Sequence, residues 1–221
     1  MKYTKEQLML TFAYMSYYGF GLVGSDAENA LKIAKDVNKA LKTWKPVKGK
    51  WELVWGPCAF AFKGDKFDDN LMFVVRSKEE PSKLVVAIRG TNPLSLKDWL
   101  IEDFDVVPMT KWKYGDKEKG LNPKISRGTD IGLTHLQEMV ATKGVPGAGL
   151  SLLQFLQEAS NENKETEICV TGHSLGGALA PTLALWLKDI QGSELTENAK
   201  ISTVAFAGPS AGNEDFANYS D

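Results

Sequence analysis

The segment Gly172-His173-Ser174-Leu175-Gly176 places one serine two residues from a glycine on each side. Before it, residues 167–171 form a short apolar and β-branched run of the kind that makes a buried strand. After it, residues 176–187 form an apolar run that predicts a buried helix. A strand that turns sharply into a helix pushes the side chain at the turn outward, and glycines leave room for such a turn. We therefore expect Ser174 to stand at the carboxyl end of a sheet.

A strand, a G-x-S-x-G turn and a helix in this order form the nucleophile elbow of the α/β-hydrolases. The alternative is a tight strand-to-helix crossover that carries a serine by chance. In that fold an acid and then a histidine follow the serine along the chain. Both histidines of this chain, His135 and His173, precede Ser174. Two explanations stay open: the partner residues lie in a missing C-terminal portion, or an ordinary triad does not activate this serine.

Composition places the chain among globular proteins with a substantial core. Its 221 residues suit one α/β domain, with 43% hydrophobic and 24% charged residues. The formal net charge is −2 and the lysines are scattered among acids, which gives no reason to expect nucleic acid as a partner. No signal peptide or transmembrane segment is visible, so we expect a cytoplasmic protein or an already processed secreted form.

The two cysteines, Cys58 and Cys169, do not suggest a disulfide framework. Cys169 lies in the predicted strand before the serine, where we expect a small buried hydrophobic residue. Cys58 lies in another predicted strand, and a catalytic Cys58–His135 pair is an alternative that no local motif supports. The two cysteines and two histidines lack the close spacing of a structural zinc site.

Two residue pairs predict where the first helices begin. Thr4 with Gln7 and Ser25 with Glu28 have the spacing of capping boxes, and apolar residues follow each pair at helical intervals. We expect these helices to form an outer layer added before the sheet. The other predicted elements are strands at 51–62, 70–75, 83–89 and 200–207, helices at 95–104, 129–141 and 149–160, and a long surface loop at 105–124. The sheet is expected to start antiparallel and to continue as a parallel sheet with helices on both faces.

Four stretches in the second part of the chain form a recognisable set. They are Val85–Thr91, Lys97–Asp103, Thr171–Ala180, and Phe206–Pro209 running on to Gly212-Asn213 and Phe216-Ala217. Together they resemble the class 3 lipases, the α/β-hydrolases typified by fungal triacylglycerol lipases, over about residues 80–220. The resemblance implies an α/β-hydrolase fold, with a mostly parallel central sheet, helices on both faces and, here, no C-terminal strands.

The resemblance also implies roles for three residues. Ser174 matches the nucleophile, while Thr91 and Leu175 match the positions whose backbone N–H groups form the oxyanion hole. The alternative for Thr91 is a turn residue at a strand end that hydrogen-bonds locally, and the oxyanion role is favoured. Residues 92–103 match the position of the family's lid, and the alternative is a fixed amphipathic helix packed on the sheet. No metal or organic cofactor is implied.

The chain departs from the family pattern at its end. In class 3 lipases the acid and the histidine follow the Gly-Pro and Gly-Asn region, whereas this sequence stops at Asp221 before either match. Asp215 lies too early to be that acid, His173 is expected to point away from the serine, and His135 belongs to a helix well before the elbow. We therefore expect residues 1–221 to form a single α/β-hydrolase domain that is incomplete at its C-terminus, with the general base and acid outside this chain.

These residues predict a serine carboxylic-ester hydrolase, a lipase or esterase, that cleaves acyl esters of lipids through an acyl-enzyme on Ser174. The alternative is a catalytically silent hydrolase-fold protein that binds an acyl ligand or a partner, and an acyltransferase or thioesterase would share the same elbow. The expected partners are an ester substrate and, transiently, a lipid interface. If strands are missing after Ala207, a second copy, a swapped segment or a separate chain piece should cover the exposed sheet edge.

Overall fold

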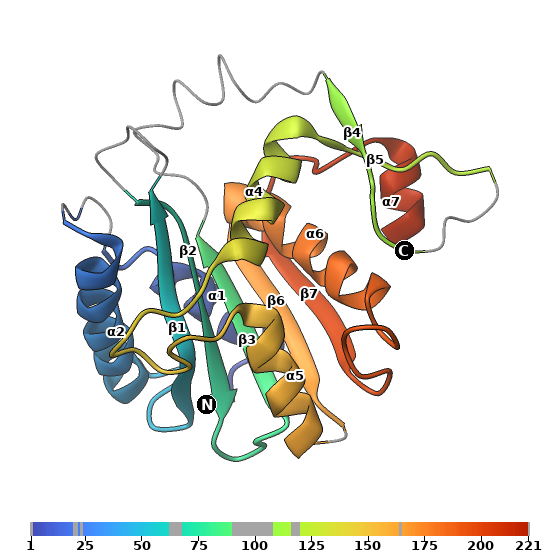
Figure 1. Cartoon of the computed structure of the whole chain (residues 1–221). Coiled ribbons are helices and arrows are strands. Elements are labelled where there is room, and N and C mark those ends of the chain that lie inside the picture. The colour runs from blue at the N-terminus through green and yellow to red at the C-terminus, as the bar shows by residue number, and fades with distance from the viewer. Residues whose placement is uncertain are drawn as a thin grey trace.

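A five-stranded sheet forms the centre of the molecule, with its strands in the order β1-β2-β3-β6-β7 (Figure 1). The computed structural model describes residues 2–19, 22, 24–61, 68–89, 108–115, 120–163 and 165–220. The strands are β1 (Trp51–Ala61), β2 (Asp68–Ser77), β3 (Lys83–Arg89), β6 (Glu167–His173) and β7 (Lys200–Phe206). No helix in the described part of the chain is both long and apolar enough to cross a membrane.

The sheet has an antiparallel half and a parallel half, as the sequence predicts. β1 pairs with β2 and β2 with β3 in antiparallel register, whereas β3, β6 and β7 run parallel. In the parallel half, Arg89, His173 and Phe206 lie opposite one another at the ends of their strands. The carboxyl ends of the three strands therefore meet at one edge, which is where open α/β sheets carry their sites.

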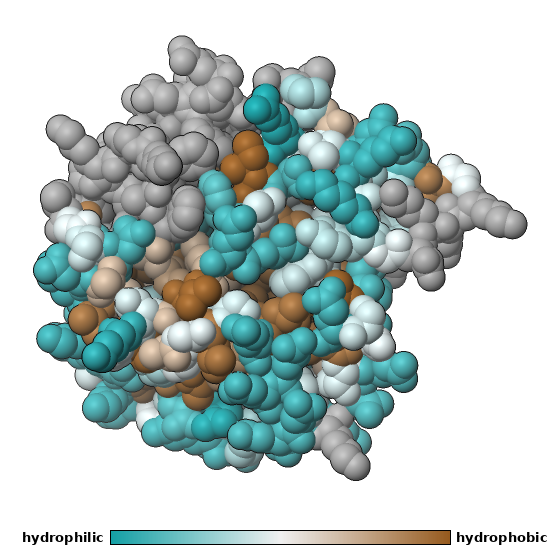
Figure 2. All heavy atoms as spheres, in the orientation of Figure 1, coloured by the Kyte–Doolittle hydropathy of each residue, from teal (hydrophilic) through white to brown (hydrophobic). Residues whose placement is uncertain are grey.

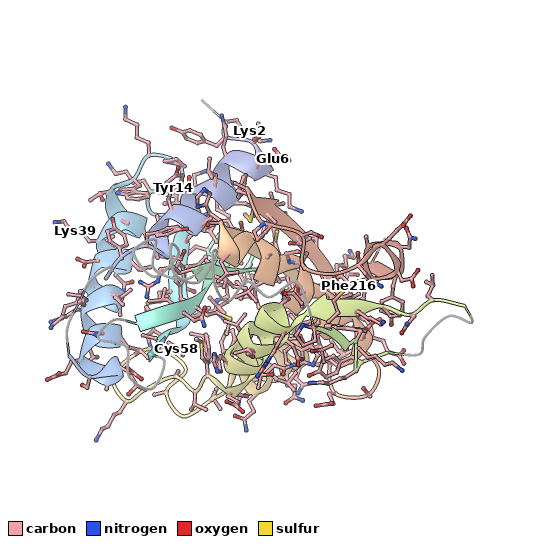
Figure 3. The ribbon with its side chains drawn as sticks, turned by 90° about the horizontal axis from the view of Figure 1, so that it is seen from above. Lys2, Glu6, Tyr14, Lys39, Cys58 and Phe216 are labelled. Carbon is pink, nitrogen blue, oxygen red and sulfur yellow. The ribbon has the colours of Figure 1, made fainter. Side chains whose placement is uncertain are left out.

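Two helices precede the sheet, α1 (Lys5–Met15) and α2 (Asp26–Thr43). Both begin at a predicted capping box, with Thr4 and Ser25 as the N-caps. α1 packs on β3, β6 and β7, while α2 packs against β1 at the antiparallel side. Figure 3, seen from above, shows α1 on the side of the sheet opposite to α4, with Lys2 and Glu6 near its start.

The other face of the sheet is covered by α4 (Arg127–Glu138), α5 (Leu152–Glu162) and α6 (Leu175–Asp189). α6 packs on β3, β6 and β7, and α4 packs on α6. A Cβ added at Gly132 of α4 would lie 2.7 Å from a methyl group of Leu179, so the glycine permits this close approach. Figure 2 shows that hydrophobic residues reach the surface of this face in scattered groups between hydrophilic ones.

The segment predicted as a long surface loop at 105–124 contains one short strand and ends where a second begins. β4 (Met109–Lys111) and β5 (Lys124–Ser126) pair in a separate antiparallel sheet, and α7 (Glu214–Ser220) packs against β5. Between the two strands Trp112 is only 1% exposed and donates a 2.6 Å hydrogen bond from Nε1 to Asp189. The loop prediction failed because Trp112 stands among lysines and glycines, and its partner lies 77 residues away in the sequence. The helix predicted at 95–104 lies outside the described residues.

In the described part of the chain β7 is an edge strand, as expected if strands are missing after Ala207. It pairs with β6 on one side, and in the described part of the chain the sheet ends with it. None of its seven residues is buried, whereas five of the seven residues of β6 are.

Candidate active site

Strand β6 ends at His173 and helix α6 begins at Leu175, so Ser174 alone makes the turn between them. Its backbone has φ 58° and ψ −126°, a region that residues with a side chain rarely adopt. Such a conformation costs about 1–3 kcal/mol and persists only where the surrounding structure enforces it. The predicted sharp turn is therefore present, and it leaves Ser174 only partly buried.

Three glycines let this turn close. A Cβ on Gly172 would collide with the backbone of Gly176, and a Cβ on Gly208 would collide with the backbone of Gly177. A Cβ on Gly177 would in turn lie 2.6 Å from the carbonyl oxygen of Phe206. Because these neighbours are backbone atoms, they cannot swing aside as the end of a flexible side chain would. The glycines are thus a steric requirement of the contact between β6, α6 and the turn after β7.

Backbone hydrogen bonds hold the serine in place. The Ser174 amide donates to the Phe206 carbonyl at 3.0 Å, and the Gly177 amide donates to the Ser174 carbonyl at 2.8 Å. The Leu175 amide is the first of α6, and among the described residues no acceptor bonds it. The first amides of a helix lack intrahelical partners and favour negative charge. The Leu175 N–H is therefore suited to bind an anion beside the serine.

His173 is held on the α1 side of the sheet by two tyrosines. The Tyr17 hydroxyl lies 2.9 Å from Nδ1 of His173 and donates to the His173 carbonyl oxygen at 3.2 Å. The Tyr14 ring stacks on the imidazole with ring centres 6.0 Å apart. Burial raises the pKa of Tyr17, so its hydroxyl keeps its proton and stays a donor. The imidazole thus turns toward α1, as expected for the neighbour of an elbow serine.

The remaining histidine and the cysteines lie in other surroundings. His135 stands in the last turn of α4, where burial lowers the pKa of its ring and the charge of Glu138 acts in the opposite sense. Cys58 is buried in β1, and this burial raises the pKa of its thiol to about 12. Because the thiolate is the reactive form, such a thiol is inert near neutral pH. The structure therefore speaks against the Cys58–His135 alternative.

The structure brings together two of the three predicted site residues, Ser174 and Leu175, at the start of α6. Thr91, the third, and residues 92–103, the proposed lid, lie outside the described residues. The sequence did not single out Tyr17, whose partner His173 is 156 residues away. Phe206 and Gly208 belong to a stretch that carries the family resemblance, and this stretch was the available signal for their contact with the elbow.

This arrangement has a definite chemical capacity. A hydroxyl on a strained turn, next to an amide without a backbone acceptor, can attack an electrophilic carbon while the amide stabilises the developing negative charge. The two rigid elements β6 and α6 fix both groups, so the geometry does not depend on a flexible loop.

Comparisons with known proteins agree with the observed fold. The family model described as "Lipase (class 3)" matches residues 85–221. The crystal structure of M37 lipase is 51% identical to the chain, with a TM-score of 0.92 over 99% of this chain and 64% of that one. No curated protein sequence matches the chain. The chain thus spans somewhat less than two thirds of the M37 lipase chain.

Two other lipase structures share the fold at lower identity. The lipase from Rhizopus microsporus var. chinensis is 19% identical, with a TM-score of 0.54 over 100% of this chain and 64% of that one. The Rhizomucor miehei lipase, in its propeptide complex, is 17% identical, with a TM-score of 0.59 over 100% of this chain and 58% of that one.

Proposed function

Because this chain belongs to the class 3 lipase family and has the α/β-hydrolase fold, we propose that it hydrolyses carboxylic esters of lipids with Ser174 as the nucleophile. The observation that carries the proposal is the strained backbone of Ser174 between β6 and α6. A crossover that merely reverses the chain does not need a side chain held at φ 58°. The strain supports a serine whose exposed position matters for chemistry.

The proposed reaction has two steps. The Oγ of Ser174 attacks the ester carbonyl while a general base takes its proton, and the tetrahedral intermediate then expels the alcohol, which receives that proton. Water next attacks the acyl-enzyme, releases the fatty acid and restores the serine hydroxyl. The Leu175 amide and the Thr91 amide are proposed to bind the oxyanion in both steps, and each such donor is worth about 3–4 kcal/mol of transition-state stabilisation.

We propose that the general base and its orienting acid come from residues outside these 221. His173 supports this, because its Nδ1 is bonded to the Tyr17 hydroxyl on the α1 side. His135 supports it as well, because it lies on α4 and not on a segment that follows the elbow, where the fold places its histidine. The match to only 64% of the M37 lipase chain agrees with this proposal.

The outer edge of β7 leads to a proposal about partners. In the described part of the chain this strand has no neighbour beyond β6. Unpaired strand edges invite pairing with another segment. We propose that a second copy, a swapped segment or a further chain piece covers this edge, and that a lipid interface contacts the protein only transiently. Light scattering, with and without residues beyond 221, separates a further piece of the same chain, which leaves a monomer, from a second copy or a swapped segment, which gives a dimer.

A fluorophosphonate probe tests the proposed nucleophile. The full natural gene product should be labelled on Ser174, Ser174→Ala should abolish labelling, and Ser193→Ala, remote on the turn after α6, should leave it unchanged. Turnover of p-nitrophenyl esters of different chain length should fall to background in the same Ser174→Ala variant. Labelling of the natural product but not of residues 1–221 alone would locate the base outside this chain. Absence of labelling and turnover in both would favour the silent binding protein.

A further inference from the structure

A cavity of about 490 Å³ lies at the edge of the sheet opposite to the elbow. It is lined by residues at the start of α1 and at the amino ends of β3, β6 and β7, including Val85, Cys169 and Ser202, which lie opposite one another. Cys169 precedes His173 by four residues of strand, which corresponds to about 13 Å. Figure 1 places the N-terminus at this same edge, where β6 begins. The cavity is therefore separate from the site at Ser174.

The inner wall of the cavity is apolar. Leu8 and Met9 of α1, Val85 of β3 and the Trp51 side chain contribute to it. Trp51 packs edge-to-face on Phe12 of α1, with ring centres 5.0 Å apart, which fixes its ring beneath that helix. Met9 and Val85 are almost fully buried, so the cavity reaches down to the hydrophobic core. Water in such a place makes few hydrogen bonds, and an apolar ligand chain would displace it favourably.

The rim of the cavity is positively charged. Five lysines line it, at positions 2, 5, 45, 50 and 83, together with three glutamates at positions 79, 80 and 167. Lys50 forms an ion pair with Glu79 at 3.2 Å, and Lys83 forms one with Glu80 at 2.6 Å. The charges within each pair cancel. Lys5 donates to the Ser202 hydroxyl at 3.3 Å, a neutral partner. The excess of two positive charges stands in contrast to the net charge of −2 of the whole chain.

We propose that this cavity binds a single-chain fatty-acid anion, with its alkyl chain on the apolar wall and its carboxylate at Lys5 and Lys45. The volume lies within the range of ordinary small-molecule sites. An apolar wall with a cationic rim complements an amphiphile that has one anionic head, and it repels a cationic head of the same chain length. The binding does not rest on the proposed reaction, because the cavity lies at the other end of β6 from Ser174.

The charge of the ligand head is tested with dodecanoate, dodecyltrimethylammonium and acetate, each below its aggregation concentration. The full natural chain carries Ser174→Ala, so that catalysis and acyl-enzyme formation cannot contribute. Titration calorimetry should show a saturable site for dodecanoate that is absent for the other two, and the lysine variants below distinguish it from product binding near position 174. Affinity should rise from octanoate to dodecanoate by several-fold per methylene, since each buried methylene contributes about 0.8 kcal/mol.

Lysine variants test the location. Lys5→Gln with Lys45→Gln should weaken dodecanoate binding by about tenfold or more, because a hydrogen bond to a charged group is worth about 1.5–3 kcal/mol. Lys39→Gln on α2, which Figure 3 shows at the outside of the molecule, is the matched control and should leave the affinity unchanged. Equal binding of the cationic amphiphile, no binding of dodecanoate, or an affinity insensitive to Lys5 and Lys45 would each overturn the proposal. Fluorophosphonate labelling is measured separately, on the chain that keeps Ser174, so the proposed nucleophile and the proposed ligand site can fail independently.

Discussion

The amide of Ser174 donates a 3.0 Å hydrogen bond to the carbonyl of Phe206, the last residue of β7. This bond extends the β6–β7 pairing one residue past the end of β6 and ties the turn to the neighbouring strand. The turn is therefore shaped from both sides, by α6 on one and β7 on the other. Substitutions in this turn should therefore change the free energy of unfolding.

The strain at Ser174 should be visible in stability. Ser174→Gly removes the Cβ that makes φ 58° unfavourable, whereas Ser174→Ala removes only the hydroxyl and keeps the strain. We expect the glycine variant to be more stable than the alanine variant by about 1 kcal/mol, after allowance for the greater freedom of glycine in the unfolded chain. Urea unfolding followed by circular dichroism measures the difference. An alanine variant as stable as the glycine variant would mean that the turn is relaxed.

Gly177 should not tolerate a side chain. Gly177→Ala would place a Cβ 2.6 Å from the Phe206 carbonyl oxygen, so we expect a loss of about 3 kcal/mol in the free energy of unfolding. Gly49→Ala is the control, because that site is open although its φ is +73°, and it should cost only about 1 kcal/mol. Similar losses at both positions would show that the backbone of β7 yields easily.

The Tyr17 hydroxyl should stabilise the end of β6. Tyr17→Phe removes its contacts with Nδ1 and the carbonyl of His173, and we expect a loss of about 1 kcal/mol in stability. If Ser174 is the nucleophile, the same change should lower kcat more than it raises KM, because it loosens the residue before the serine. Tyr14→Phe is the control, since that side chain is 54% exposed and contacts His173 through its ring. Equal effects of the two variants would contradict this role.

Asp189 should make stability depend on pH. Burial raises the pKa of this carboxyl above its ordinary value of 3.8, although Trp112 and Tyr219 donate hydrogen bonds to it. A raised pKa in the folded state means that the folded protein holds the proton more tightly. The stabilisation by this group is thus complete below the ordinary pKa and is lost as the pH rises through the raised value.

Asp189→Asn should therefore gain stability relative to the parent between pH 3 and pH 7, because the amide carries no charge to desolvate. The comparison is made by chemical unfolding at a series of pH values, with Asp36→Asn on the exposed side of α2 as the control. A constant difference between Asp189→Asn and the parent across this range would contradict the prediction.

Local chemistry determines the parts of the fold that the sequence predicts well. Thr4 and Ser25 cap the first two helices, and each pairs with a residue only three positions further along the chain. Both predicted capping boxes are present. The elbow strand and helix were predicted because their apolar runs are continuous and glycines stand between them. The bounds of β3 are as predicted for the same reason, since every residue from Leu84 to Arg89 is buried.

Contacts between distant segments account for what the sequence does not predict. The anchoring of Trp112 on Asp189 and the contact of Tyr17 with His173 join residues 77 and 156 positions apart, and no local pattern encodes either. The turn at Ser174 and its glycines are thus predictable from the sequence, whereas the side chains that support the turn are not.

The position of β7 at the edge of the described sheet has a dynamic consequence for Ser174. Outermost strands fray more readily than central ones, because their amides and carbonyls face solvent on one flank. The carbonyl that steadies Ser174 belongs to the last residue of such a strand, so the alignment of the hydroxyl is coupled to the opening and closing of β7. A segment that pairs with this flank would slow amide hydrogen exchange along β7 and narrow the range of orientations of the Ser174 hydroxyl. If Ser174 is the nucleophile, pairing at this distant edge would therefore change its reactivity without any contact with the substrate.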